Sequence, residues 1–199
     1  MSDTLDVESA LAESELVYCL PKALAWLRSR HVPDTAIIGP TARDIFGDTT
    51  FDSICVDTIV DLPCARFEFA RRMKDQRSAR RALLCPVRDE FGELADIASL
   101  DLKSGAIRLW VGRVAVLDQW RLSATKWPRL GEDLIVFGSA LKWLRNDRRG
   151  VVVIDPARAR WILEDARPIV ADSEDTFWRL ERALAGPPTL FLRKLARAA

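Results

Sequence analysis

The stretch LADIASLDLKSGAIRLWV, Leu94 to Val111, places two apolar runs on either side of a short polar segment. The polar segment, Lys103–Gly105, ends in a glycine, which reaches the positive φ that a tight hairpin turn requires. The second run alternates between two faces, which is the period of a strand. The stretch therefore predicts an antiparallel hairpin with strands at Leu94–Leu102 and Ala106–Val111.

Shorter apolar runs before this hairpin predict further strands. Ala82–Val87 is followed by the turn residues Asp89–Gly92, and Phe67 and Phe69 alternate like a strand that leads into a basic loop or short helix. In the irregular region before them, two strand pieces are predicted, at Ala36–Ile38 and Ser53–Val60. The middle of the chain is therefore expected to form antiparallel strands.

The last third of the chain alternates between strand and helix patterns. Three short apolar runs each precede a residue that can cap a helix. The predicted strands are Asp133–Phe137, Val151–Asp155 and Pro168–Asp172, and the helices that follow them begin at Ser139, at Asp155-Pro156 and at Asp172-Ser173. This order predicts a β-α-β-α-β-α unit. A short basic helix is expected at Thr189–Ala199.

The N-terminal segment from Val7 to Arg30 has helical spacing, with leucines three or four residues apart. Pro21 is expected to break it and to start a second helix that ends before Pro33. The predicted fold class is α+β, with an N-terminal helical arm at residues 1–33 and a single α+β domain at residues 34–199. The absence of a repeat or a low-complexity linker favours this division.

Composition excludes several classes of protein. The chain has 199 residues, 49% of them hydrophobic, and a net charge of +1, as expected for a folded globular protein without a strong overall field. Its acidic start is unlike a signal peptide, and no apolar run is long enough for a membrane span. We therefore expect a cytoplasmic protein.

No cofactor or metal is predicted. The four cysteines stand singly, so they are expected to be reduced and mostly buried rather than zinc ligands. No glycine-rich phosphate loop and no nucleophile elbow occurs. The single histidine, His31, is interpreted as a residue at the end of a helix and not as a general base.

Two sets of carboxylates are candidates for catalysis. Asp101 and Lys103 have the acid-x-lysine spacing of metal-dependent nucleases, with Asp96 as the second carboxylate that a divalent ion needs. The alternative interpretation, an ordinary hairpin turn, is favoured. Asp155 and Asp172 end predicted strands at the edge where α/β sheets bind ligands, but helix capping explains both.

The strongest polar feature is a basic segment between residues 71 and 81. Its cations are Arg71, Arg72, Lys74, Arg77, Arg80 and Arg81. On one exposed face they would contact a nucleic-acid backbone or a protein partner. Otherwise they form a solvated face that pairs with the acidic N-terminal arm. Trp110, Trp120, Trp127 and Trp143 allow base stacking or an interface, although core packing is the more common role of tryptophan.

From Leu94 to Leu184 the chain resembles uncharacterised proteins of alphaproteobacterial prophages and mobile elements. The resemblance rests on the runs ELADIASLDLKSGAIRLWVGRVAVL and EDLIVFGSALKWLRNDRRGVVVIDPARA, and it brings no catalytic residues. It implies a genomic setting. We therefore expect a non-enzymatic accessory protein that acts by protein or nucleic-acid binding. The alternatives are a divalent-metal-dependent nuclease or phosphoryl-transfer enzyme, and a structural homo-oligomer.

Overall fold

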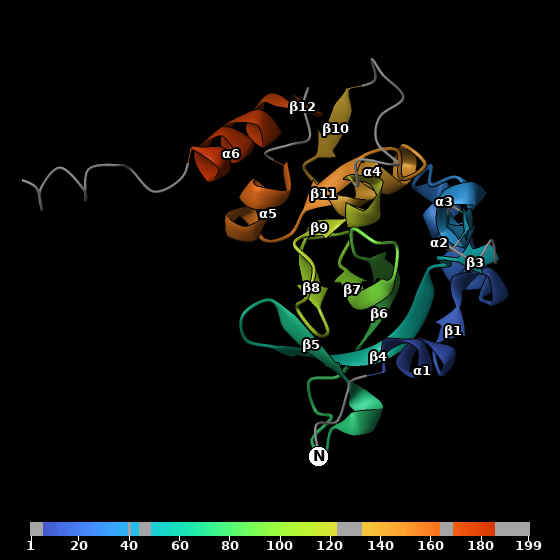
Figure 1. Ribbon diagram of the computed structural model, residues 1–199. Helices are drawn as coiled ribbons and strands as arrows, with labels where there is room; N and C mark the ends of the chain where they lie inside the picture. Colours follow the sequence, from blue (N-terminus) through green and yellow to red (C-terminus); the bar gives the residue numbers. More distant parts are fainter. Residues whose placement is uncertain (1–5, 40, 44–48, 123–132, 164–168, 186–199) are drawn as a thin grey trace, which may run out of the picture.

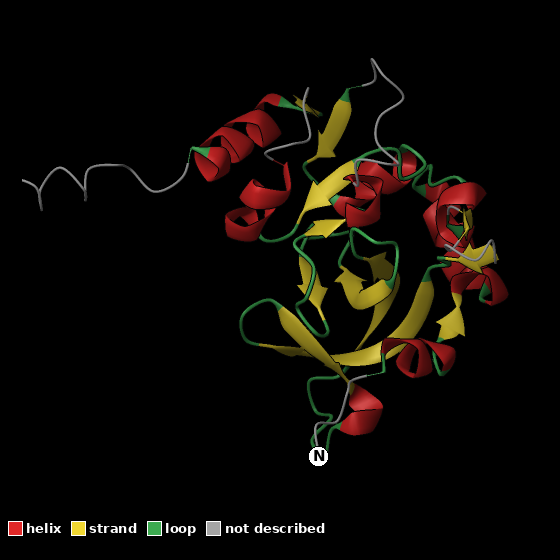
Figure 2. Ribbon diagram, viewed as in Figure 1, coloured by secondary structure: helices red, strands yellow, loops and turns green. Residues whose placement is uncertain are grey.

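The computed structural model describes residues 6–39, 41–43, 49–122, 133–163 and 169–185 (Figure 1). It confirms the α+β class. Strands occupy the centre of the molecule and helices lie around them (Figure 2). Trp127 and the helix expected at Thr189–Ala199 lie outside the described residues.

The central strands close on themselves. They are β4 (Cys55–Leu62), β5 (Arg66–Phe69), β6 (Arg80–Arg88), β7 (Leu94–Leu100) and β8 (Ile107–Leu109). Their order is β4-β5-β8-β7-β6, and β6 pairs again with β4, so the five strands form a ring. All of these pairs are antiparallel except the pair β5–β8. The short helix η2 (Ala70–Arg72) follows β5, as the sequence predicts.

The predicted hairpin is present, and local chemistry explains its turn. Asp101 accepts hydrogen bonds from the backbone amides of Lys103 and Ser104 at 3.0 and 3.1 Å, which folds the chain back after β7. Gly105 then has a φ of +78°, the region in which an L side chain is disfavoured. The strands on either side pair through Leu100 and Ile107.

The N-terminal segment differs from its prediction. Pro21 does start a helix, but the preceding residues are not one continuous helix: α1 (Val7–Ala12) is followed by β1 (Glu15–Leu16), η1 (Val17–Cys19) and α2 (Pro21–Ser29). Strand β1 pairs with the start of β4, a partner that helical leucine spacing does not reveal. Val17 and Leu27 are buried in the same core as strand residues from β6 and β7. A domain boundary after residue 33 stays a prediction.

The prediction of a strand at Ala36–Ile38 is wrong, because these residues belong to helix α3 (Asp34–Ile38). An apolar run of three residues does not distinguish a strand from a turn of helix. Pro33 and the acidic Asp34 at the start of the run are suited to a helix N-terminus. A hairpin of β2 (Thr41–Arg43) and β3 (Thr49–Phe51) follows α3.

The last third forms a second sheet in the order β12-β10-β11-β9. Along the chain the elements are β9 (Val116–Leu117), η3 (Gln119–Leu122), β10 (Leu134–Phe137), α4 (Ala140–Arg145), β11 (Val151–Val153), α5 (Pro156–Leu163), β12 (Ile169–Ala171) and α6 (Glu174–Leu184). β10 pairs in parallel with both β11 and β12. The three strands predicted in this part of the chain are present, and α4 packs through the buried Leu144 and the partly buried Leu141.

One core joins the two sheets. Phe137, Trp143 and Val152 from the second sheet and α4 are buried together with Val56 and Leu100 from the ring. Near this core, Thr35 at the start of α3 donates a hydrogen bond to Asp147 after α4. The other face of the second sheet packs under α5 and α6.

Candidate binding groove

Asp96, a candidate nuclease carboxylate, is a structural residue of the ring. It is fully buried. Its two oxygens accept hydrogen bonds from the backbone amides of Ile97, Val111 and Arg113 at 2.8, 2.9 and 2.7 Å. The carboxylate thereby ties β7 to the chain after β8, and its hydrogen bonds leave it poorly placed to ligate a metal ion.

Asp101 and Lys103 lie at the far end of β7. Asp101 is five positions after Asp96, which along a strand is a distance of roughly 16 Å, and the odd spacing turns the two side chains to opposite faces. Asp101 accepts hydrogen bonds from Lys103 and Ser104 in the turn, and Lys103 is exposed. Within the described parts of the chain, no three histidine, cysteine or acidic side chains are grouped as metal ligands.

Asp155 caps helix α5, as the sequence predicts, but the residue that caps α6 is Ser173 and not Asp172, so capping does not explain Asp172. Asp155 accepts hydrogen bonds from the first amides of α5. Asp172 accepts one from the Gly138 amide at 3.0 Å and one from the Thr176 hydroxyl at 2.6 Å, and it lies 2.8 Å from the ammonium of Lys142. Burial alone would raise the pKa of Asp172, but these three donors outweigh it and hold the pKa below 3.8.

This lowered pKa predicts an acid-dependent contribution to stability. A carboxylate with a depressed folded-state pKa stabilises the protein above its unfolded pKa, and that stability is lost as the pH falls through the folded-state value. We expect Asp172→Asn to lower the free energy of unfolding by about 2 kcal/mol at pH 7, because it removes charged hydrogen bonds. In urea unfolding at several pH values, the difference from wild type should shrink below pH 3.8. Asp175→Asn, at a position whose side chain is 84% exposed, is the control. A difference constant from pH 7 to pH 2 would contradict the prediction.

Two of the four cysteines are buried and two are exposed. Cys55 and Cys85 are buried, and burial raises the pKa of these thiols to about 11 and about 12. Cys19 and Cys64 are exposed, which differs from the expectation that most cysteines are buried. His31 follows the end of α2, as predicted.

The basic segment is largely engaged within the molecule. Arg71 contacts Glu13, Asp57 and the Ala10 carbonyl oxygen and lies over the Phe69 ring. The other contacts are Arg72 over Trp110, Arg80 with Asp61 and Arg81 with Glu15. Lys74 is exposed, and the Arg77 side chain is 95% exposed. Pairing with the acidic N-terminal segment, one of the two interpretations from sequence, therefore accounts for Arg71 and Arg81.

The tryptophans have two kinds of environment. Trp110 and Trp143 are buried, which fits packing and not base stacking. The large exposed rings instead include Trp161 on α5 and Phe177 and Trp178 on α6. The homo-oligomer expected to use exposed aromatics stays a prediction.

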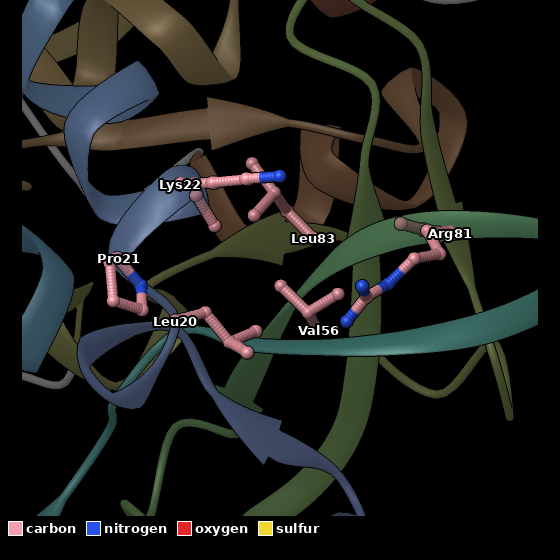
Figure 3. A pocket seen from close by; sticks show the side chains of 8 residues that line it. Leu20, Pro21, Lys22, Val56, Arg81 and Leu83 are labelled. Atoms are coloured by element: carbon pink, nitrogen blue, oxygen red, sulfur yellow. The ribbon is translucent and has the colours of Figure 1, made fainter.

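An apolar groove lies between α2 and the ring. Strand register aligns Val56, Leu83, Leu100 and Ile107 side by side across four strands on one face. Helix α2 covers part of this face. Where α2 begins, a hollow of about 570 Å³ remains, lined by Leu20, Pro21, Lys22, Ala23, Val56, Arg81, Ala82 and Leu83 (Figure 3). This volume is within the range of sites that bind small molecules or side-chain anchors.

A second hollow extends the groove along α2. It has a volume of about 250 Å³ and shares Ala23, Arg81, Ala82 and Leu83 with the first. Its other lining residues are Trp26, Arg80, Leu100 and the turn residues Asp101, Leu102 and Lys103. The stretch that suggests a nuclease in the sequence thus forms one end of an apolar groove.

The groove carries more positive than negative charge. Lys22 and Arg81 line the first hollow, and Arg80, Arg81 and Lys103 line the second, with Asp101 as the acid among its lining residues. Sequence reasoning found Arg80 and Arg81 through their charge. It missed Lys22, Val56 and Leu83, because only the packing of α2 on β4 and β6 brings them together.

Comparison of this chain with protein-family models, curated proteins and solved structures gives no match. Among the described helices, none is long and apolar enough to cross a membrane. The groove must therefore be interpreted from its own chemistry.

Proposed function

We propose that this protein is a non-enzymatic binding module that holds a segment of a partner protein in the groove between α2 and strands β4 and β6. The observation that carries the proposal is the apolar hollow of about 570 Å³ with Lys22 and Arg81 in its lining. Apolar side chains of a peptide would fill the hollow, and acidic residues would complement the cations. The accessory role in a mobile element and the cytoplasmic setting belong to the same proposal.

A protein segment suits this groove better than nucleic acid does. Single-stranded nucleic acid is held by aromatic side chains on which the bases stack, together with a run of cations along the backbone. The first hollow is lined by aliphatic residues and two cations, with no aromatic ring among its lining residues, and the second hollow adds the single ring of Trp26. One ring does not provide a row of stacking positions for successive bases. Farther along the basic segment, Arg71 and Arg80 already contact Asp57 and Asp61.

The test is selection from a display library of random peptides. Against the wild-type protein, the recovered peptides should combine aliphatic or aromatic residues with aspartate or glutamate. Ala23→Phe should weaken their binding at least tenfold in fluorescence anisotropy, because Ala23 lines both hollows and a phenyl ring would fill them. The matched control is Ala25→Phe, at an exposed position of the same helix, which should bind as wild type. Circular dichroism melting of both variants separates a filled groove from an unfolded protein.

Two outcomes would overturn the proposal. One is recovery of no peptide, or only of peptides that bind Ala23→Phe as tightly as wild type. The other is retention of labelled single- or double-stranded DNA or RNA at roughly 50 mM salt, where phosphate contacts are strong. If Arg77→Gln reduced that retention, the exposed cations of the basic segment would be the binding surface instead.

A further inference from the structure

Arg81 occupies the boundary between the two hollows. It is on strand β6 and lines both of them, together with Ala23, Ala82 and Leu83. On either side of this boundary the lining is largely apolar, with Leu20 and Val56 in one hollow and Leu100 and Leu102 in the other. A segment lying along the groove would therefore place apolar residues in both hollows. The part of the segment between these residues would lie next to Arg81.

The guanidinium of Arg81 already holds a carboxylate of the same chain. Its Nη2 lies 2.8 Å from Oε2 of Glu15, and both side chains are 63% exposed. Glu15 reaches this position because β1 pairs with β4, with Glu15 opposite Val56. Exposed ion pairs of this kind contribute little to stability. The contact can therefore be exchanged for another carboxylate at small cost.

We propose that the partner segment presents an acidic residue with apolar residues on both sides, and that its carboxylate replaces Glu15 on Arg81. This inference rests on the proposed function of the groove and specifies the partner's chemistry. The apolar flanks of the segment exclude water from the new ion pair, which strengthens it relative to the exposed pair with Glu15. Glu15 then acts as a competitor within the chain and lowers the affinity for any segment that needs Arg81.

A carboxylate fits this position better than a phosphate group. Phosphorylated or highly acidic segments are recognised by clusters of arginines that act together. Here the neighbouring Arg80 is already paired with Asp61, at 2.9 Å, and Asp101 adds a negative charge to the second hollow. Arg81 is the cation common to both hollows, with Lys22 in one and Lys103 in the other, and its guanidinium is matched by one carboxylate between two apolar residues.

The test uses the tightest peptide recovered from the display library and measures its affinity by fluorescence anisotropy. We expect Arg81→Gln to weaken binding about tenfold and Glu15→Gln to strengthen it about threefold, because the competing carboxylate is gone. Changing the peptide's acidic residue to its amide should weaken binding to wild type about tenfold, but should have little further effect on Arg81→Gln. Arg77→Gln and Glu8→Gln are the charge-matched controls at exposed positions, and both should bind as wild type.

The outcomes separate this inference from the proposed function. In one outcome, the peptides lose their binding to Ala23→Phe but bind Arg81→Gln and Glu15→Gln as tightly as wild type. That result would overturn the proposed replacement of Glu15 on Arg81 and would leave the groove as the binding site. The same holds if Glu15→Gln weakens binding, since Glu15 would then help to hold the ligand. Failure to recover any peptide overturns both.

Discussion

Replacing Asp96 with asparagine should lower the free energy of unfolding by about 3 kcal/mol, the loss expected when buried donors are left facing a charge-neutral amide. The carboxylate is fully buried and accepts three backbone hydrogen bonds, from Ile97, Val111 and Arg113. An asparagine keeps one acceptor oxygen and turns an NH₂ group toward an amide that needs an acceptor. Urea unfolding measures the effect. The slope of the free energy of unfolding against urea concentration should be the same as in wild type.

Asp101→Asn is the matched control for this substitution. Asp101 also accepts backbone hydrogen bonds, but in a partly exposed turn where an asparagine side chain can make the same contacts. Its effect should stay within about 0.5 kcal/mol. The comparison also tests the nuclease alternative. If Asp96→Asn kept wild-type stability but abolished a magnesium-dependent cleavage of DNA or RNA, Asp96 would be catalytic and not structural.

Replacing Trp143 with alanine should lower the free energy of unfolding by about 4 kcal/mol, the usual loss for a fully buried large aromatic side chain. Trp143 is on α4 and is 0% exposed. Its indole Nε1 donates a hydrogen bond to the Gly150 carbonyl oxygen, and the buried Arg148 guanidinium lies 5.3 Å from the ring centroid. Alanine leaves a cavity in the core shared by both sheets and removes the ring beneath a buried charge.

Thermal unfolding checks this prediction. For a chain of this length, a loss of that size lowers the melting temperature by roughly 10 °C. Trp143→Phe should have a smaller effect, because a ring still fills much of the space. Trp161→Ala, at a side chain that is 69% exposed, is the control and should change the free energy of unfolding by less than about 0.5 kcal/mol. Equal effects of Trp143→Ala and Trp161→Ala would contradict the assignment of Trp143 to the core.

The sequence alone was sufficient to predict those turns and helix starts whose determining contacts are between residues close together in the chain. The hairpin turn needs a positive φ at Gly105, which residue type alone predicts. Asp101, which the sequence places in the preceding strand, adds hydrogen bonds within the turn. Helices α4 and α6 begin after Ser139 and Ser173, whose hydroxyl groups accept hydrogen bonds from amides three residues ahead. Such caps and turns are decided within about one helical turn, so their chemistry is visible in the sequence.

Only the tertiary structure decided which distant segments meet. Leu16 has the spacing of a helix, but it belongs to a strand because the start of β4, nearly forty residues later, supplies its hydrogen-bonding partner. The same pairing brings Glu15 to Arg81, so that this arginine of the basic segment forms an ion pair. The groove likewise requires α2, β4 and β6 together. Its shape and charge depend on contacts between residues far apart in the chain, and residue type and local spacing do not determine those contacts.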